Sequence, residues 1–214
     1  MIRCFIPIKE HSKRVVDKNF RILKNKKLYQ IVLEKARAVS NVDEVVVDTD
    51  SQEIKDYCVL NNIKYIHRDP KNSLDTAGGN DLIKTWLEIF PDTTIIIQTH
   101  VTCPFLKVET LYNMVEIMKK GYCDSSLTVC KEQTWFWFDG SPVNYSLDKL
   151  TRSQDAKFLI KETTSTYCIT SRAFLELNRR IGNNPFFYFV DKIESIDIDD
   201  ELDFKIAKAI GDLI

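Results

Sequence analysis

The run Thr94-Ile95-Ile96-Ile97-Gln98 carries the strongest apolar signal in the chain and predicts a buried β-strand. Two more apolar runs, Cys4–Ile8 and Val45–Val47, predict strands of the same kind. Segments with helical spacing alternate with these runs, at residues 28–39, 52–61 and 108–119. Because strands alternating with helices form parallel sheets covered on both faces, we expect a three-layer, Rossmann-like α/β domain with a mostly parallel sheet.

One segment interrupts this rhythm. From Lys131 to about Thr166 the sequence is aromatic and polar, has few helix signals and contains the aromatic run Trp135–Phe138. The 214 residues suffice for one domain, so we expect a single domain over 1–214 with a β-rich excursion at about 131–166. Aromatic side chains are enriched in interfaces, and the excursion therefore predicts a homodimer contact.

Composition excludes several classes of function. Thirty basic against 31 acidic side chains give a net charge of −1, without the basic excess typical of nucleic-acid binding. No apolar run approaches the roughly 18 residues that span a bilayer, and the start does not read as a signal peptide. The six cysteines lack metal-like spacing and predict reduced thiols. We therefore expect a cytoplasmic protein that binds neither nucleic acid nor membrane.

The loop after the first predicted strand, Lys9–Asn19, is strongly basic. Ligands of α/β sheets bind beyond the carboxyl ends of the strands, where this loop is expected. Four cations within ten residues can neutralise a polyphosphate, and Ser12 and backbone N–H groups can add hydrogen bonds. The glycines of a Walker A loop are absent. The alternative interpretation is a solvated basic loop.

The segment Ser195–Phe204 is rich in aspartate. If it is a strand, Asp197 and Asp199 face one side while the intervening isoleucines face the core. Two convergent carboxylates suit Mg²⁺, which commonly binds through one or two carboxylates plus substrate phosphates. The alternative is that Asp199 or Asp200 caps the following helix.

A second aspartate pair, Asp48 and Asp50, follows the strand Val45–Val47. Glycosyltransferases hold metal with such pairs, although strand termination and helix capping are favoured here. The three histidines lack the spacing of a zinc site. Cys103, in a predicted loop, is noted as a possible thiol.

Together these segments resemble the acylneuraminate cytidylyltransferase family over nearly the whole chain. The first loop is similar to A-R-x-x-S-K-G-[IL]-P-x-K-N, and the closing Ser195–Asp203 matches S-I-D-I-D-x-E-x-D. Four further segments resemble V-V-V-S-T-D, R-P followed by D-T-A, Q-P-T-S-P and R-x-Q-D: Val45–Asp50, Arg68 with Asp75–Ala77, His100–Pro104, and Arg152–Asp155.

The resemblance implies a nucleotidyltransferase fold, a homodimer, and transfer of CMP from CTP to an acidic nonulosonic or ulosonic sugar with release of pyrophosphate. It implies that Asp197 and Asp199 hold Mg²⁺. The implied catalytic contacts with the triphosphate are Lys9, Lys13 and Lys18. The implied nucleotide-binding residues are Ser12, Asn19, Arg68, Gly79, His100, Thr102 and Pro104, and the implied sugar-binding residues are Arg152, Gln154 and Lys161.

The chain departs from the family pattern at several positions. Lys9 stands at an arginine position and lacks the bidentate fork, His100 replaces a glutamine, and Glu162–Thr164 replaces E-N-G. Three alternatives remain: an acceptor such as Kdo, pseudaminic acid, legionaminic acid or a phosphonate, a glycosyltransferase using Asp48 and Asp50, and a binding module without turnover.

Overall fold

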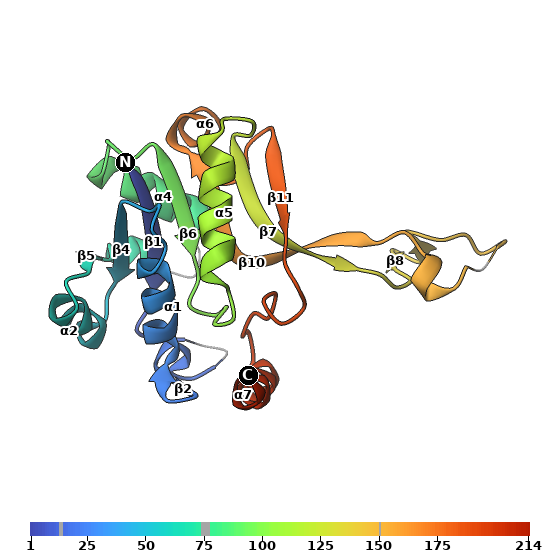
Figure 1. The fold of residues 1–214 in the computed structure, drawn as a ribbon, viewed down its shortest axis with the longest axis horizontal. Coiled ribbons are helices and arrows are strands. Elements are labelled where there is room, and N and C mark those ends of the chain that lie inside the picture. The colour runs from blue at the N-terminus through green and yellow to red at the C-terminus, as the bar shows by residue number, and fades with distance from the viewer. Residues whose placement is uncertain (13–14, 74–77, 150) are drawn as a thin grey trace.

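A seven-stranded sheet forms the centre of the molecule (Figure 1). The computed structural model describes residues 1–12, 15–73, 78–149 and 151–214. The strand order is β11-β7-β10-β6-β1-β4-β5, and only β10 runs antiparallel to its neighbours among these strands. The strands are β1 Ile2–Ile8, β4 Glu44–Thr49, β5 Lys64–His67, β6 Ile95–Thr99, β7 Ser125–Glu132, β10 Leu159–Thr170 and β11 Pro185–Phe189. The predicted mostly parallel sheet is confirmed.

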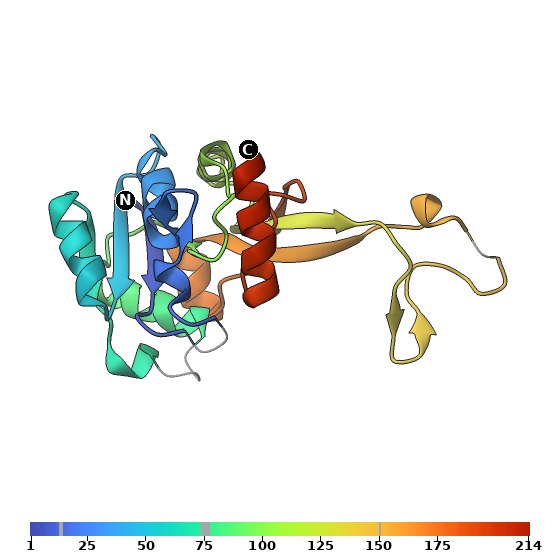
Figure 2. The ribbon, with the colours of Figure 1, turned by 90° about the horizontal axis from the view of Figure 1, so that it is seen from below.

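Helices cover both faces of this sheet, with α1 and α5 on one side and α4 and α6 on the other (Figure 2). Alternation along β1 explains the two cores. Ile6 and Ile8 pack into the cluster with α1 and α5, whereas Phe5 faces α4 and stacks on Trp86 at 4.6 Å between ring centroids. The helices are α1 Leu28–Arg37, α2 Gln52–Leu60, α3 Pro70–Ser73, α4 Gly79–Ile89, α5 Val108–Lys119, α6 Ser171–Leu177 and α7 Glu201–Leu213.

The C-terminal helix α7 docks onto the segment that follows the first loop. This segment comprises the 3₁₀ helix η1 (Lys18–Phe20) and the hairpin β2 (Ile22–Leu23) and β3 (Lys26–Lys27). The Arg21 guanidinium lies 3.7 Å from the Phe204 ring centroid and forms a 2.6 Å ion pair with Glu201. These contacts join the C-terminal helix to a segment within the first 27 residues of the chain.

An arm projects from the sheet where β7 and β10 extend beyond their neighbours (Figures 1 and 2). It holds the strand pair β8 (Trp137–Phe138) and β9 (Ser141–Pro142) and the 3₁₀ helix η2 (Ser153–Asp155). The arm lies within the expected excursion, although residues 159–166 belong to the long strand β10. Trp137 and Phe138 are 54% and 78% exposed.

The C-terminal part differs from expectation. The aspartate-rich segment was considered as a strand, but residues 190–200 are irregular, and the last strand is β11. β11 lies at the sheet edge, where Pro185 can occupy its first position without breaking a central ladder. In the described ranges, none of the helices is both long and apolar enough to cross a membrane.

Candidate active site

A cavity of about 270 Å³ lies at the carboxyl ends of β1 and β6 and is called the first cavity below. It gathers eight of the residues predicted from the sequence: Lys9, Ser12, Lys18, Asn19, Arg68, Gly79, His100 and Thr102. Lys13 and the Asp75–Ala77 motif lie outside the described residues. The topology thus brings together side chains that are up to 93 residues apart in sequence, from Lys9 to Thr102.

The basic loop is anchored at several points. Lys9 Nζ donates to the carbonyl of Ser73 at 2.9 Å, and Asn19 Nδ2 donates to the carbonyl of Lys9 at 2.8 Å. Lys18 is only 9% exposed, and its Nζ donates to the carbonyl of Ile198 at 2.7 Å. Lys18 Nζ also lies 4.0 Å from the carboxylate of Asp199. A buried cation held in this way does not fit the alternative of a solvated basic surface.

The aspartate-rich segment lines a second cavity, of about 510 Å³, into which Asp197, Asp199 and Lys161 all contribute. The segment is not the strand that we expected, yet Ile198 between the two aspartates is fully buried. Lys192 also lines this cavity. It was missed in the sequence, because it belongs to none of the motifs that predicted site residues.

The alternative interpretation, helix capping, is confirmed for Asp200 and not for Asp199. Asp200 is the N-cap of α7, and its carboxylate accepts from the backbone N–H groups of Leu202 and Asp203 at 2.8 and 2.9 Å. The Asp203 carboxylate accepts in turn from the backbone N–H groups of Asp199 and Asp200. The capping box therefore uses Asp200 and Asp203. The carboxylates of Asp197 and Asp199 do not cap this helix.

The environment of Asp197 suits a cation. Its Oδ2 accepts from Thr164 Oγ1, whereas its Oδ1 is buried and has no hydrogen-bond partner among the described residues. A buried carboxylate oxygen without a partner is costly, and a bound cation would remove that cost. Within the described ranges no three metal-type ligands cluster, so the protein offers two carboxylates. Two carboxylates fit Mg²⁺, whose remaining ligands are commonly water and substrate phosphates.

Thr164 connects the two cavities. It lies in the irregular part of β10 between Glu162 and Tyr167 and has a left-handed backbone with φ of 58°. Its carbonyl accepts from His100 Nδ1 at 2.6 Å, which places the ring proton on that nitrogen because a carbonyl only accepts. Burial, opposed by this hydrogen bond, lowers the pKa of His100. His100 is therefore a neutral side chain near pH 7.

The second aspartate pair is structural, and its interpretation as a metal site is wrong. Asp48 is 1% exposed, and its carboxylate accepts from Arg68 Nε at 3.0 Å and from Trp86 Nε1 at 2.7 Å. Asp50 accepts from the backbone N–H of Glu10 and the hydroxyl of Ser73. Asp48 is therefore closed to a substrate, and the alternative of a glycosyltransferase that binds its metal through Asp48 and Asp50 is not supported.

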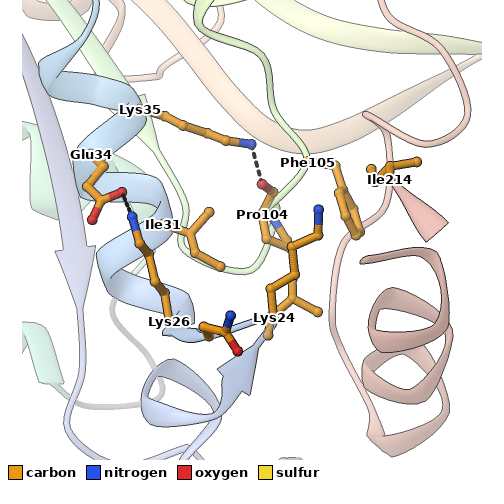
Figure 3. Close-up of a pocket in the computed structure, with 10 residues that line it drawn as sticks. Lys24, Lys26, Ile31, Glu34, Lys35, Pro104, Phe105 and Ile214 are labelled. Atoms are coloured by element: carbon orange, nitrogen blue, oxygen red, sulfur yellow. Dashed lines mark hydrogen bonds and ion pairs between the residues drawn. The ribbon is translucent and has the colours of Figure 1, made fainter. Parts of the chain in front are cut away.

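Three predicted ligands lie elsewhere. Pro104 lines a separate, mainly apolar cavity of about 410 Å³, where its carbonyl accepts from Lys35 Nζ at 2.5 Å (Figure 3). Pro104 thus does not line the first cavity, and its assignment to the nucleotide stays a prediction. Arg152 and Gln154 lie on the arm, and neither lines a cavity with the other predicted residues of their own chain. Arg152 forms an ion pair with Asp155 at 2.7 Å.

Gln98 and Arg180 are among the lining residues of the first cavity that were missed in the sequence. Gln98 ends a hydrophobic run, and Arg180 follows α6 in a loop without a recognisable motif. A polar residue at the end of a buried strand was the available signal for Gln98.

The Cys103 thiol is fully buried, and burial raises its pKa well above its usual value, so a reactive thiol is not supported.

Known proteins resemble the chain along its length. A family profile described as cytidylyltransferase matches residues 4–204. An N-acylneuraminate cytidylyltransferase of Streptococcus agalactiae is 24% identical over 210 residues, covering 94% of this chain and 51% of that protein. A CMP-N,N'-diacetyllegionaminic acid synthase of Legionella pneumophila is 28% identical, covering 99% of this chain and 97% of that protein. The chain thus spans about half the length of the first relative and nearly all of the second.

The fold has counterparts among solved structures. A CMP:2-keto-3-deoxy-manno-octonic acid synthetase complexed with CTP matches with a TM-score of 0.72 at 15% identity, covering 100% of this chain and 99% of that chain. This likeness supports the nucleotidyltransferase fold. The family profile covers nearly the whole chain and agrees with the motifs, and so this chain belongs to the cytidylyltransferase family.

Proposed function

We propose that the chain transfers CMP from CTP to an acidic sugar of the nonulosonic or ulosonic type and releases pyrophosphate. The observation that carries the proposal is the position of Lys18. It lines the first cavity, and its ammonium group contacts the segment of Asp197 and Asp199 that lines the second. A polyphosphate in the first cavity would thus lie beside the carboxylate pair. The names of the relatives from Streptococcus and Legionella support the same substrate class.

The roles of the residues follow from charge and position. Lys9, Ser12 and Lys18 would contact the triphosphate, as would Lys13, while Asn19, Arg68, Gly79, His100 and Thr102 would surround the nucleoside. The acceptor hydroxyl loses its proton, and its oxygen bonds to the α-phosphorus as the bond to the bridging oxygen breaks and pyrophosphate leaves. The lysines stabilise the charge that develops on the phosphates.

The carboxylates of Asp197 and Asp199 would hold Mg²⁺, which supplies additional neutralisation of phosphate charge when it is bound. The partnerless Oδ1 of Asp197 supports this assignment. Lys161 and Lys192, in the same cavity, would pair with the carboxylate of the sugar acid. Both substrates are anions, so the two lysines would neutralise the sugar carboxylate directly, whereas the carboxylate pair would act on the triphosphate through the cation that it holds.

The arm would complete the site in a homodimer. Its exposed aromatics, Trp137 and Phe138, are costly to leave in water. An arm that reaches a second copy would bury them and could carry Arg152 and Gln154 to the sugar cavity of the partner. This placement accounts for why these two residues lie apart from the cavities of their own chain.

The test is pyrophosphate release from CTP with sialic, legionaminic and pseudaminic acids and Kdo, each with Mg²⁺ and with excess chelator. We expect release with at least one acid, only in the presence of the metal, and loss of release in Asp197→Ala and Asp199→Ala. Asp212→Ala, an exposed acid on α7, is the matched control. Binding of CTP without release for any acid would favour a binding module. Full activity in Asp199→Ala would contradict the metal assignment.

A further inference from the structure

A third cavity lies apart from the candidate active site, between helix α1, the hairpin of β2 and β3, and the residues Pro104 and Phe105 (Figure 3). Its volume is about 410 Å³, and among the described residues it shares no lining residue with the first or the second cavity. Pro104 follows His100 and Thr102 of the first cavity in the same loop. The third cavity therefore borders the candidate active site but is not part of it.

The wall of the third cavity is mainly apolar. The apolar side chains that line it are Leu23, Ile31, Pro104, Phe105 and Ile214, and Leu23 and Phe105 are 3% and 9% exposed. Ligand sites of about 300–1,000 Å³ are typically lined by apolar side chains with a few polar groups that orient the ligand. The size and the lining of this cavity thus suit a small molecule with an apolar body.

Two lysines supply polar groups in this apolar wall. Lys35, on α1, donates from Nζ to the carbonyl of Pro104 at 2.5 Å, and Lys24, in the turn of the hairpin, reaches toward the same part of the cavity (Figure 3). Burial lowers the pKa of Lys35; the negative charge of Glu194 opposes this shift, and the positive charge of Lys24 adds to it. Two ammonium groups therefore converge on an apolar space, which is unfavourable without an anion near them.

The carboxylate in the wall does not neutralise this pair. Glu34 is the one acid among the lining residues, and its carboxylate accepts from Lys26 Nζ at 2.5 Å. Within the described part of the chain, neither Lys24 nor Lys35 forms an ion pair. The cavity therefore offers positive charge to a ligand.

The available donors favour a carboxylate over a phosphate. A phosphate monoester brings close to two negative charges and three acceptor oxygens. Besides the paired Lys26, the lining offers only the ammonium groups of Lys24 and Lys35 and the amide of Asn25 as side-chain donors. Because Glu194 already offsets part of the positive charge at Lys35, a single negative charge is the better match.

We propose that the third cavity binds a small amphipathic carboxylate, with its apolar body against Ile31 and Phe105 and its carboxylate accepting from Lys24 and Lys35. The carboxylate would replace the Pro104 carbonyl as the acceptor for Lys35, because a hydrogen bond between two charged groups is the stronger one. The apolar body would leave water for an apolar wall. The site goes beyond the function proposed above and does not depend on it, because it lies outside both cavities used there.

The test is titration calorimetry on the full chain with octanoate, 1-octanol and acetate. Octanoate has the apolar body and the charge, 1-octanol has the body alone, and acetate has the charge alone. We expect octanoate to bind one site with a Kd below about 1 mM, as a modest affinity per atom gives for a molecule of its size. 1-Octanol should bind at least about tenfold more weakly, because it lacks the charge-assisted hydrogen bonds. Acetate should show no saturable binding.

Lysine variants separate the contribution of each charge. Lys24→Met and Lys35→Met should each weaken octanoate binding about tenfold to a hundredfold, the range for a charge-assisted hydrogen bond, and leave 1-octanol binding within about threefold of wild type. Lys84→Met, at an exposed position of α4 on the other face of the sheet, is the matched control and should bind like wild type. Lys24 has a left-handed φ of 56°, where lysine and methionine have the same Cβ penalty, so Lys24→Met should fold like wild type.

A variant that fills the cavity provides a further comparison. Ile31→Trp keeps both lysines and should abolish octanoate binding, with circular dichroism unchanged. Octanoate binding that persists in Ile31→Trp would place the ligand on another apolar surface, such as the arm, and overturn the proposal. A change of assembly state in Ile31→Trp by light scattering would assign the cavity to a contact with a second copy and also overturn it.

Three results with the other proteins would overturn the proposal whether or not Ile31→Trp folds. The first is no saturable octanoate binding to wild type up to about 10 mM. The second is equal affinity of wild type for octanoate and 1-octanol, which would leave the lysines without a role. The third is equal octanoate affinity in Lys24→Met and Lys84→Met.

Discussion

Thr164 is a β-branched residue in a backbone conformation that favours glycine. Its φ of 58° puts it in the left-handed region, within the irregular part of β10. For a residue with a Cβ atom this conformation costs about 1–2 kcal/mol, whereas glycine adopts it at almost no steric cost. The side chain offsets part of this cost through the hydrogen bond from Thr164 Oγ1 to Asp197.

A comparison of two substitutions isolates the backbone contribution. Thr164→Gly and Thr164→Ala both lose the hydrogen bond to Asp197, so this loss cancels between them. The alanine keeps its Cβ and the left-handed penalty of about 1–2 kcal/mol, and the glycine loses about 0.5–1 kcal/mol through the entropy of the unfolded chain. We therefore expect Thr164→Gly to be more stable than Thr164→Ala by about 0.5–1 kcal/mol. For a domain of this size the melting temperature should differ by roughly 1–4 °C.

The assay is urea unfolding, with thermal unfolding as a second measurement. Thr134, which does not have a positive φ, provides the matched position, where the alanine variant should be at least as stable as the glycine variant. The glycine variant should thus be the more stable of the two at position 164, and the alanine variant should be at least as stable as the glycine variant at position 134. An alanine variant at position 164 as stable as the glycine variant would refute the reasoning.

Three further predictions concern other contacts. Burial lowers the pKa of His100 in the folded state, so the unfolded chain binds more protons as the pH falls below about 6.5, and the free energy of unfolding decreases as the pH decreases. His100→Gln should flatten this part of the urea-unfolding pH profile, and an unchanged slope would contradict the prediction. Asp48→Ala should lower the free energy of unfolding by about 3–5 kcal/mol, because it leaves the 2%-exposed Arg68 unpaired; a loss under 1 kcal/mol, about that of a surface pair, would argue against it. Trp137→Asp should convert a dimer into a monomer by light scattering at micromolar concentration, and a dimer indifferent to it would place the interface elsewhere.

The arrangement of the site also explains the departures from the family motifs. Thr164 stands where the motif has glycine, and the structure retains the left-handed backbone that a glycine would favour. In exchange the hydroxyl orients Asp197, and the carbonyl fixes the tautomer of His100. Two altered positions, Thr164 and His100, are thus in contact with each other.

Local patterns were enough to predict much of the fold. The helix Val108–Lys119 matches the predicted bounds, and the strand Ile95–Thr99 lies where the apolar run indicated. Both signals are local, because the period of buried positions and the β-branched composition depend only on neighbours in the sequence. The Asp197 and Asp199 pair was also readable, since a compact motif carries it.

Tertiary structure alone decided which of the other polar residues meet. Lys18 reaches Ile198 across 180 positions, and Arg180 reaches Gln98 across 82, distances over which no local pattern operates. The same holds for Asp48, whose motif suggested a metal ligand until its burial against Arg68 and Trp86 showed a structural role. Sequence pattern determined the elements and the acidic motif, whereas the site depended on which strand ends the sheet order placed side by side, because that order is set by packing between distant segments.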